Sequence, residues 1–529
     1  MTRSAAIAPL LTPLTLAACA GSGDAPPPMG LAGRPAAAAI EADPYFEAAQ
    51  ATLAERRAVR PITGRAKNAI IFLADGMGPT TVTAARIFDG QSRGEAGEEN
   101  YLSFERMPHL ALAKTYNTDA QTPDSAGTMS AIVTGVKTKI GVISMTDAVV
   151  RGECAASRGA EAPTLVELAE QAGMATGVIS TARLTHATPA AAYAHSPDRN
   201  WERDTNLPEE AVENGCRDIA RQLIEFPYGD GLELAMGGGR SNFLPIEAKD
   251  PEDGDAAGGR KDGRNLIDEW NAKSDSHVAV VDQQGFDALD PSDAPRVLGL
   301  FERSHMEYEA DRKADAGGEP SLAEMTRFAI DLLSREEDGF VLVVEAGRVD
   351  HAHHAGNAAR ALGDAQAFSE AIAAALDMTS PEETLIVATA DHGHTLTIAG
   401  YPRKGNNILG LVENPAGVFS GRFARAADGK GYTTLGYANG PGSVIFGLKN
   451  AKRAAPNPTE TTNVSYRQQA AIPLGSETHG GQDVAIYASG PGAYLFDGTV
   501  EQNYIFHVVD DALRLRRRTK KHSAHGGRL

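Results

Sequence analysis

Short apolar runs recur along the chain, and each run is continuous rather than alternating with polar residues. The runs cover residues 70–74, 176–179, 340–344, 385–388 and 484–487. Continuous runs of this length are typical of strands that are buried on both faces, as in a parallel sheet. The pattern therefore predicts several strands of a mostly parallel sheet.

Stretches between these runs have helical periodicity, at residues 164–172, 219–224, 321–333 and 358–376. Strands that alternate with helices predict an α/β fold. Two further segments, about 240–320 and about 400–470, are rich in Gly, Asp or Pro and look like insertions.

Residues with reactive side chains stand where the apolar runs end. Asp75 follows the first run, Glu345 the third and Asp391 the fourth. In open parallel sheets, ligands bind beyond the carboxyl ends of the strands. We therefore expect the functional site at this edge of the sheet.

Asp350 and His354 are four residues apart, so they share one face if the segment is helical. Aspartate and histidine together form a ligand set suited to Zn²⁺. His479, just before the run at 484–487, is the best candidate for a third ligand. On its own, a pair with this spacing also fits a surface salt bridge.

A second pair, Asp391 and His392, forms a similar group that Asp75 can complete.

Far upstream, Asp124 and Ser125 stand at the predicted start of a helix. A serine close to metal-binding side chains is typical of a metal-activated nucleophile. Either residue also fits a simple helix N-cap.

Length and charge restrict the partners. The chain has 529 residues, 42% of them hydrophobic, and a formal net charge of −19. The length allows one large domain or two or three smaller ones. The charge argues against nucleic acid or an acidic membrane surface as a partner, and an anionic substrate requires strong local positive charge.

The two ends of the chain have distinctive compositions. Residues 1–19 resemble a bacterial lipoprotein signal in which Cys19 is acylated, although an ordinary cleaved signal also fits. Residues 20–40, rich in Gly, Pro and Ala, then predict a flexible tether. We expect an exported protein of the bacterial periplasm or cell envelope, whose contact with a membrane is the N-terminal lipid anchor. The basic tail, residues 514–529, favours a solvated disordered end over a partner-binding tail.

The remaining cysteines are Cys154 and Cys216. In an exported protein two cysteines most economically form one disulfide. Two buried free thiols are the alternative.

Around these residues the chain resembles the alkaline phosphatases, especially the animal-type members, from about residue 43 to about residue 511. The motifs that carry the resemblance are residues 72–78, 123–125, 134–137, 187–190, 198–201, 236–240, 344–354, 389–392 and 477–481. The resemblance implies a three-layer α/β sandwich over residues 41–513, with a mostly parallel sheet between helices, a metal-loop insertion at about 240–320 and a crown insertion at about 400–470. It also implies a Cys154–Cys216 disulfide and a homodimer.

The resemblance further implies a phosphomonoesterase. Ser125 would be phosphorylated as the nucleophile, and zinc-bound hydroxide would hydrolyse the phosphoserine to release phosphate and an alcohol. Arg199 would bind the phosphoryl oxygens, and Asp124 would lie beside the nucleophile. The first zinc would be held by Asp350, His354 and His479; the second by Asp75, Asp391, His392 and Ser125; and a magnesium by Asp75, Thr188 and Glu345, with His186 nearby.

A calcium site is a further expectation. The positions that match the family's calcium ligands are Glu252, the Phe301 carbonyl, Glu302 and Glu319. Oxygen-only ligands suit Ca²⁺. Carboxylates in a Gly-rich acidic loop are also often only solvated.

Parts of the sequence also fit other functions. Residues 154–158 (Cys-Ala-Ala-Ser-Arg) resemble a sulfatase signature, and phosphodiester hydrolysis is a related activity. A non-catalytic metal-binding surface lipoprotein would predict a broken site, whereas Ser125, Arg199 and the expected metal ligands are all present.

Overall fold

The computed structural model describes residues 40, 42–252, 254–443 and 453–526, and for residues 521–526 the backbone alone. Cys19 and the predicted signal and tether therefore lie outside the described residues, apart from residue 40. The chain divides into two units, residues 1–59 and 60–529. In the first, helix α2 (Pro44–Ala58) begins at Asp43, whose side chain accepts hydrogen bonds from two backbone N–H groups. None of the residues of α2 is buried.

The second unit is built on a ten-stranded sheet. Its strands, in spatial order, are β15 (Thr499–Glu501), β2 (His109–Lys114), β14 (Val484–Ser489), β8 (Thr384–Thr389), β1 (Asn68–Ala74), β7 (Phe340–Ala346), β3 (Ala175–Arg183), β4 (Leu234–Gly238), β6 (Arg296–Leu300) and β5 (His277–Val280). All neighbouring pairs are parallel except those of β14, which is antiparallel to β2 and β8. The five predicted strands are β1, β3, β7, β8 and β14, so the prediction of a mostly parallel sheet is confirmed.

The centre of the sheet is sealed from solvent. Every residue of β7 and β8 is buried, as are six of the seven residues of β1. Ala74 at the end of β1 pairs with Ala346 of β7. Glu345 therefore lies inside β7 rather than after its end, which corrects the predicted boundary, because its backbone is still paired with Leu73 of β1 and Ser180 of β3.

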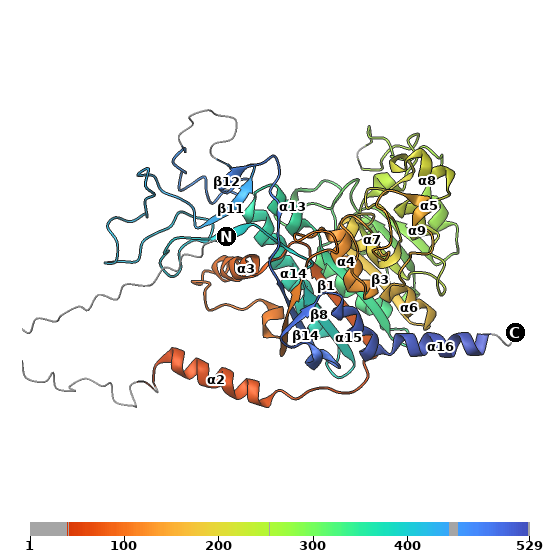
Figure 1. Cartoon of the computed structure of the whole chain (residues 1–529), viewed down its shortest axis with the longest axis horizontal. Coiled ribbons are helices and arrows are strands. Elements are labelled where there is room, and N and C mark those ends of the chain that lie inside the picture. The colour runs from red at the N-terminus through yellow and green to blue at the C-terminus, as the bar shows by residue number, and fades with distance from the viewer. Residues whose placement is uncertain (1–39, 41, 253, 444–452, 527–529) are drawn as a thin grey trace, which may run out of the picture. The chain divides into compact units, whose positions relative to one another are not determined.

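Helices pack beside the sheet in two groups (Figure 1). One group is centred on α14 (Ala358–Met378), which contacts α3 (Pro79–Ser92), α12 (Leu322–Leu333) and α13 (Arg348–His354). The other is α4 (Ser125–Thr134), α6 (Leu165–Gln171), α7 (Ala187–Tyr193), α9 (Ile219–Ile224) and α15 (Tyr504–Leu513). The helices predicted from periodicity are α6, α9, α12 and α14. Every helix in the described part of the chain is too short or too polar to cross a membrane.

The two glycine-rich segments differ from simple loops. The first, about 240–320, supplies β5 and β6 at one edge of the main sheet, and it also holds α10 (Leu266–Asn271) and α11 (Gln283–Asp287). These strands were missed because their runs are short and lie among loop-forming residues. The second, about 400–470, contributes β11 (Leu435–Gly440) to a separate three-stranded sheet, in which β10 (Leu396–Ile398) precedes the segment and β12 (Ala470–Pro473) begins at its end.

Cys154, at the start of α5 (Cys154–Ser157), is joined by a disulfide to Cys216, which follows α8 (Glu209–Glu213). The predicted disulfide is therefore confirmed. The basic tail is helix α16 (Leu515–Gly526) rather than a disordered end. Its first residue, Leu515, is completely buried in the core, and this packing explains why the segment is ordered.

Candidate metal centre and nucleophile

Two neighbouring strands bring the first carboxylates together. Asp75 directly follows β1, and Asp391 follows β8 by two residues. Leu73 pairs with Thr389 across these strands, so both aspartates emerge at the same edge. The Gly76 N–H donates to Asp391 Oδ1 at 3.0 Å. These residues therefore lie at the carboxyl edge of the sheet, where the sequence analysis predicted the functional site.

His354, His479 and Asp350 converge on one point. The Nε2 atoms of the two histidines lie 3.1 Å apart, and each is 3.4 Å from Asp350 Oδ1. His354 Nδ1 faces the Glu477 carbonyl at 2.6 Å, and His479 Nδ1 faces the Pro123 carbonyl at 2.7 Å. A carbonyl only accepts, so each ring carries its proton on Nδ1 and presents an Nε2 lone pair. Two lone pairs and a carboxylate oxygen that meet in this way fit a divalent metal ion.

A second group surrounds the serine. Ser125 Oγ lies 3.3 Å from Asp75 Oδ1 and 3.2 Å from His392 Nε2. His392 Nε2 is 3.3 Å from Asp75 Oδ1 and 3.4 Å from Asp391 Oδ2. All four residues are almost completely buried. The predicted set of Asp75, Asp391, His392 and Ser125 is therefore assembled around one point.

A third group lies on the other oxygen of Asp75. Thr188 Oγ1 is 3.4 Å from Asp75 Oδ2, and ligand atoms of Asp75, His186 and Glu345 lie within 4.8 Å of one another. Ser180 Oγ donates to Glu345 Oε2, whereas Glu345 Oε1 is buried without a partner among the described residues. An unpaired carboxylate oxygen in this place fits a cation.

The crowded carboxylates of the site favour bound cations. Burial, followed by the charges of Asp391 and Asp350, raises the pKa of Asp75 well above its ordinary value. Burial raises the pKa of Asp391 too, and it raises the pKa of Glu345 to about 8. Burial lowers the pKa of His392 well below its ordinary value. The ligand histidine is thus neutral, while the crowded carboxylates lack a compensating positive charge from the protein.

His394 and Glu477 are neighbours of the site that the sequence analysis did not assign. His394 Nε2 is 2.7 Å from Asp350 Oδ1, and its Nδ1 is 2.5 Å from Glu477 Oε2. Burial opposes a charge on this ring, but the two carboxylates raise the pKa of His394 to about 9. His394 therefore donates to Asp350 and orients it. The available signals were the position of His394 two residues after His392 and that of Glu477 two residues before His479.

Helix α4 presents the serine and its neighbour Asp124. Asp124 is the N-cap and accepts from the Gly127 N–H at 3.2 Å, while Arg199 Nη1 donates to its other oxygen at 3.0 Å. The N-cap interpretation of Asp124 is therefore confirmed alongside its contact with Arg199. A Cβ at Gly127 would lie 1.9 Å from Asn117 Nδ2, so this turn of α4 requires glycine. Asn117, which the sequence analysis missed, accepts from the Asp124 N–H at 2.9 Å.

A separate acidic group lies in the segment before β7. Ligand oxygens of Glu252, Glu302 and Asp315 lie within 4.8 Å of one another. Asp315 was not expected, whereas the expected Glu319 is outside this trio and accepts from the Glu307 N–H at 2.9 Å. Glu319 is 2% exposed, and its Oε2 has no partner among the described residues. The Phe301 carbonyl accepts from Arg240 Nη1 at 3.1 Å.

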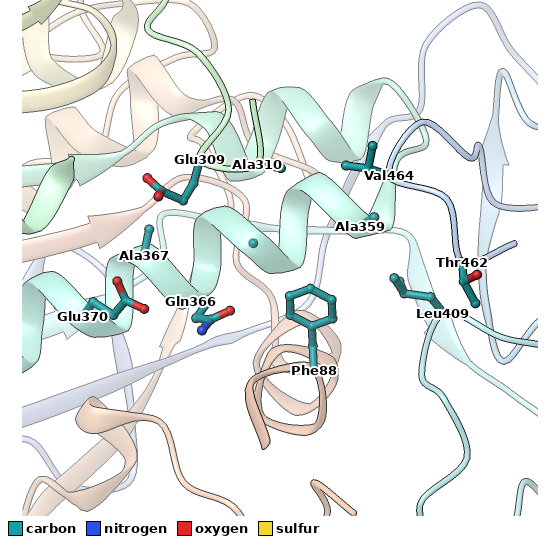
Figure 2. A pocket seen from close by; sticks show the side chains of 11 residues that line it. Phe88, Glu309, Ala310, Ala359, Gln366, Ala367, Glu370, Leu409, Thr462 and Val464 are labelled. Atoms are coloured by element: carbon teal, nitrogen blue, oxygen red, sulfur yellow. The ribbon is translucent and has the colours of Figure 1, made fainter. Parts of the chain in front are cut away.

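An apolar hollow of about 360 Å³ lies elsewhere, between α3 and α14 (Figure 2). Phe88, Ala359 and Leu409 contribute to its walls, and Glu309 and Glu370 lie at its edge. None of the metal-centre residues named above is among its lining residues. It is therefore separate from the candidate centre.

Comparison with known proteins agrees with this geometry. The alkaline phosphatase family model matches residues 66–515. The chain is 42% identical over 479 residues to the alkaline phosphatase of Gadus morhua, which covers 89% of this chain and 97% of that protein. It is also 42% identical to the tissue-nonspecific isozyme of Homo sapiens, over 89% of this chain and 88% of that protein. The Thermus thermophilus alkaline phosphatase has the same fold, with a TM-score of 0.60, 24% identity and coverage of 88% of this chain and 96% of that one. By its match along most of its length and by these identities, the chain belongs to the alkaline phosphatase family.

Proposed function

We propose that the protein hydrolyses small phosphomonoesters through a phosphoserine at Ser125. The observation that carries this proposal is the position of Ser125 Oγ, 3.3 Å from Asp75 Oδ1 and 3.2 Å from His392 Nε2. Ser125 Oγ forms a bond to phosphorus while the ester P–O bond breaks, and the alcohol leaves. Water then breaks the phosphoserine and releases inorganic phosphate.

Two Zn²⁺ and one Mg²⁺ are the proposed ions, and the residues present fit them. The first zinc is assigned to Asp350, His354 and His479; the second to Asp75, Asp391, His392 and Ser125; and magnesium to Asp75, Thr188 and Glu345. Bound here, these ions lower the pKa of the serine hydroxyl and of water and neutralise charge on the phosphate. With the four carboxylates and Arg199, the formal charge of the loaded site is about +3, or about +2 with Asp124. A phosphate dianion is therefore attracted despite the overall charge of −19.

The protein's own groups bind and orient the phosphate. Arg199 offers a planar pair of N–H groups to two phosphate oxygens. Asp124 holds its guanidinium at 3.0 Å, and His186 Nε2 lies 3.1 Å from its second terminal nitrogen. Ser125 starts the ten-residue helix α4, whose first N–H groups favour an anion.

The decisive experiment is Ser125→Ala together with a search for the phosphoserine. We expect the variant to lose about a thousandfold or more of the wild-type kcat, and the wild type incubated with labelled phosphate to carry label on Ser125. Ser130→Ala, which removes another buried serine of α4, is the matched control. Full activity of Ser125→Ala, or label on another residue, would reject the proposal.

Metal analysis tests the proposed ions separately. We expect two zinc ions and one magnesium ion per chain. His186 contributes to the third group, and its Nδ1 is buried without a partner among the described residues. We therefore expect His186→Asp to change the dependence of activity on Mg²⁺. Identical magnesium titrations of variant and wild type would count against this role.

A calcium ion is proposed at the acidic group of Glu252, Glu302 and Asp315, with Glu319 and the Phe301 carbonyl beside it. Burial, followed by the charge of Glu252, raises the pKa of Glu302 to about 7. Glu252 is paired with Arg240, whereas Asp315 Oδ2 and Glu319 Oε2 are buried without a partner among the described residues. Carboxylates held this close, with two such oxygens, favour an oxygen-binding cation.

Export, a lipid anchor at Cys19 and a homodimer are further proposals, supported by the signal-like N-terminus and by family membership. Radiolabelled palmitate on the wild type but not on Cys19→Ser would test the anchor, and light scattering would test the dimer. Sulfate and phosphodiester hydrolysis are alternative activities. The sulfatase-like pattern is disfavoured because Cys154 is in a disulfide. Parallel assays with p-nitrophenyl phosphate, p-nitrophenyl sulfate and a bis-phosphodiester rank the three activities.

A further inference from the structure

A positively charged hollow lies between helices α15 and α16, outside the metal centre. Its volume is about 360 Å³. Its cationic side chains are Arg514, Arg516, Arg517 and Lys520, and its carboxylates are Asp510 and Asp511. The formal charge of these six residues is +2, in a chain whose total is −19. Figure 1 shows α16 continuing from α15 toward the C-terminus.

The hollow is held in place by the rest of the fold. Leu515 is completely buried, and Arg518 forms an ion pair with Asp338 at 2.6 Å. Arg516 Nε donates to the buried Asp510 carboxylate at 2.5 Å. The negative charge of Asp510 is therefore neutralised by Arg516. The first turns of α16 are therefore fixed with their remaining cations toward solvent.

Three of these cations are not paired with a carboxylate among the residues that the structure describes. Arg514, Arg517 and Lys520 are exposed, and none of them forms an ion pair within the described part of the chain. Arg514 and Arg517 also line an adjoining hollow of about 100 Å³ together with the exposed Arg65. Guanidinium and ammonium groups arranged around a hollow of this size fit the oxygens of a phosphate group.

Arg514 occupies a backbone conformation that favours glycine. It is the C-cap of α15, with φ of 58° and ψ of 38° in the left-handed region. Glycine is the usual residue at such a helix end because a side chain there is strained. The chain instead places an arginine where the two hollows meet.

We propose that this surface, defined by Arg65, Arg514, Arg516, Arg517 and Lys520, binds the phosphate headgroups of an anionic lipid membrane. The total charge of the chain does not prevent this, because at physiological salt charges more than about 8 Å away are largely screened. A flat membrane meets one face of the protein, whereas a polyanion that wraps the chain also meets its acidic faces. Basic residues at a membrane surface each strengthen binding about fivefold. Such binding is weak alone and depends on several basic residues acting together.

The test uses the full chain carrying Cys19→Ser, so that no acyl chain can attach. Its binding to vesicles of dioleoyl phosphatidylglycerol and phosphatidylcholine is compared with binding to pure phosphatidylcholine, by co-sedimentation. The test variant is Arg514→Gln, Arg517→Gln and Lys520→Gln combined. The matched control is Lys249→Gln, Lys261→Gln and Arg335→Gln combined, at cations that are exposed elsewhere.

We expect binding to the anionic vesicles only, weakened by raising NaCl from 0.1 to 0.5 M and reduced about a hundredfold in the test variant. The control variant should bind the vesicles as the parent does. Both variants should keep the phosphatase activity of the parent. Equal binding to both kinds of vesicle, or unchanged binding of the test variant, overturns the proposal. Retention on heparin without binding to anionic vesicles also overturns it, in favour of a soluble polyanion.

Discussion

The Nε2 atoms of His354 and His479 face each other at 3.1 Å, while the Nδ1 atom of each ring faces a backbone carbonyl. The tautomers follow from the two carbonyls that accept from Nδ1, at 2.6 and 2.7 Å. Two lone pairs at this distance repel unless a cation lies between them. The fold thus holds these rings in an arrangement that is favourable only with metal bound.

Metal removal should therefore lower stability as well as activity. An ion present at about a thousand times its Kd stabilises the folded state by about 4 kcal/mol. Calorimetry with and without chelator should show a lower Tm in the chelator, restored with activity by Zn²⁺. His354→Ala should reduce the chelator's effect on Tm, whereas His507→Gln, at an exposed histidine outside the centre, should not. A Tm unaffected by chelation would contradict this reading of the histidine pair.

Replacing Arg199 by lysine should weaken phosphate binding more than it disturbs the fold. Lysine keeps the charge but loses the planar pair of donors, and it cannot bond both Asp124 and a phosphate oxygen in the same way. We expect the Ki for inorganic phosphate to rise about tenfold to a hundredfold, which corresponds to about 1.5–3 kcal/mol. Asp124→Asn should give a smaller rise, because it loosens Arg199 without removing it. An unchanged Ki in Arg199→Lys would exclude the guanidinium as a phosphate ligand.

The sequence predicted the centre of this fold better than its edges. The runs that became β1, β7 and β8 are buried on both faces, so their apolar pattern was unambiguous. β5 is mostly half-buried and β15 has no buried residue, so neither carries such a pattern. Pairing across the sheet, not local sequence, makes these segments strands.

The same distinction holds at the site. The full ligand sets could be named because the motifs around Asp75, Asp350 and Asp391 resemble those of the alkaline phosphatases, whereas each Asp/His pair alone also fits a salt bridge. His394 and Asp315 were missed because their functions depend on partners distant in sequence: His394 lies between Asp350 and Glu477, and Asp315 lies beside Glu252 and Glu302. Only the folded chain brings these groups together.

The acidic group should bind Ca²⁺ through Asp315. Calcium should raise the Tm of the wild type in the presence of saturating Zn²⁺ and Mg²⁺. Asp315→Asn removes a ligand oxygen charge and should reduce Ca²⁺ affinity at least about tenfold. Terbium luminescence gives the affinity independently of activity. Glu247→Gln, an exposed acidic residue outside the group, is the matched control. No calcium-dependent change in Tm, or equal affinities of wild type and Asp315→Asn, would refute the site.

Glu170 and Glu233 should make the protein less stable at high pH. Burial, followed by the charge of Glu233, raises the pKa of Glu170 from 4.5 to about 9, although Thr176 donates to it at 2.5 Å. Below about pH 4.5 both the folded and the unfolded carboxyl are protonated, and the stabilisation is complete. As the pH rises toward 9, the unfolded chain releases the proton that the folded chain keeps, so the free energy of unfolding falls.

The glutamine side chain of Glu170→Gln cannot ionise, so this variant should not lose stability in this way at high pH. We expect its free energy of unfolding to exceed that of the wild type by on the order of a few kcal/mol at pH 9, with little difference at pH 5. Chemical denaturation at pH 5, 7 and 9 measures the effect, and Glu209→Gln, at an exposed glutamate, controls for the lost charge. Because burial raises the pKa of Glu233 only to about 7, the gain from Glu233→Gln should already be complete near that pH. If the free energy of unfolding depended on pH in the same way for wild type and Glu170→Gln, the prediction would be wrong, because Glu170 would then ionise equally well in the folded and unfolded protein.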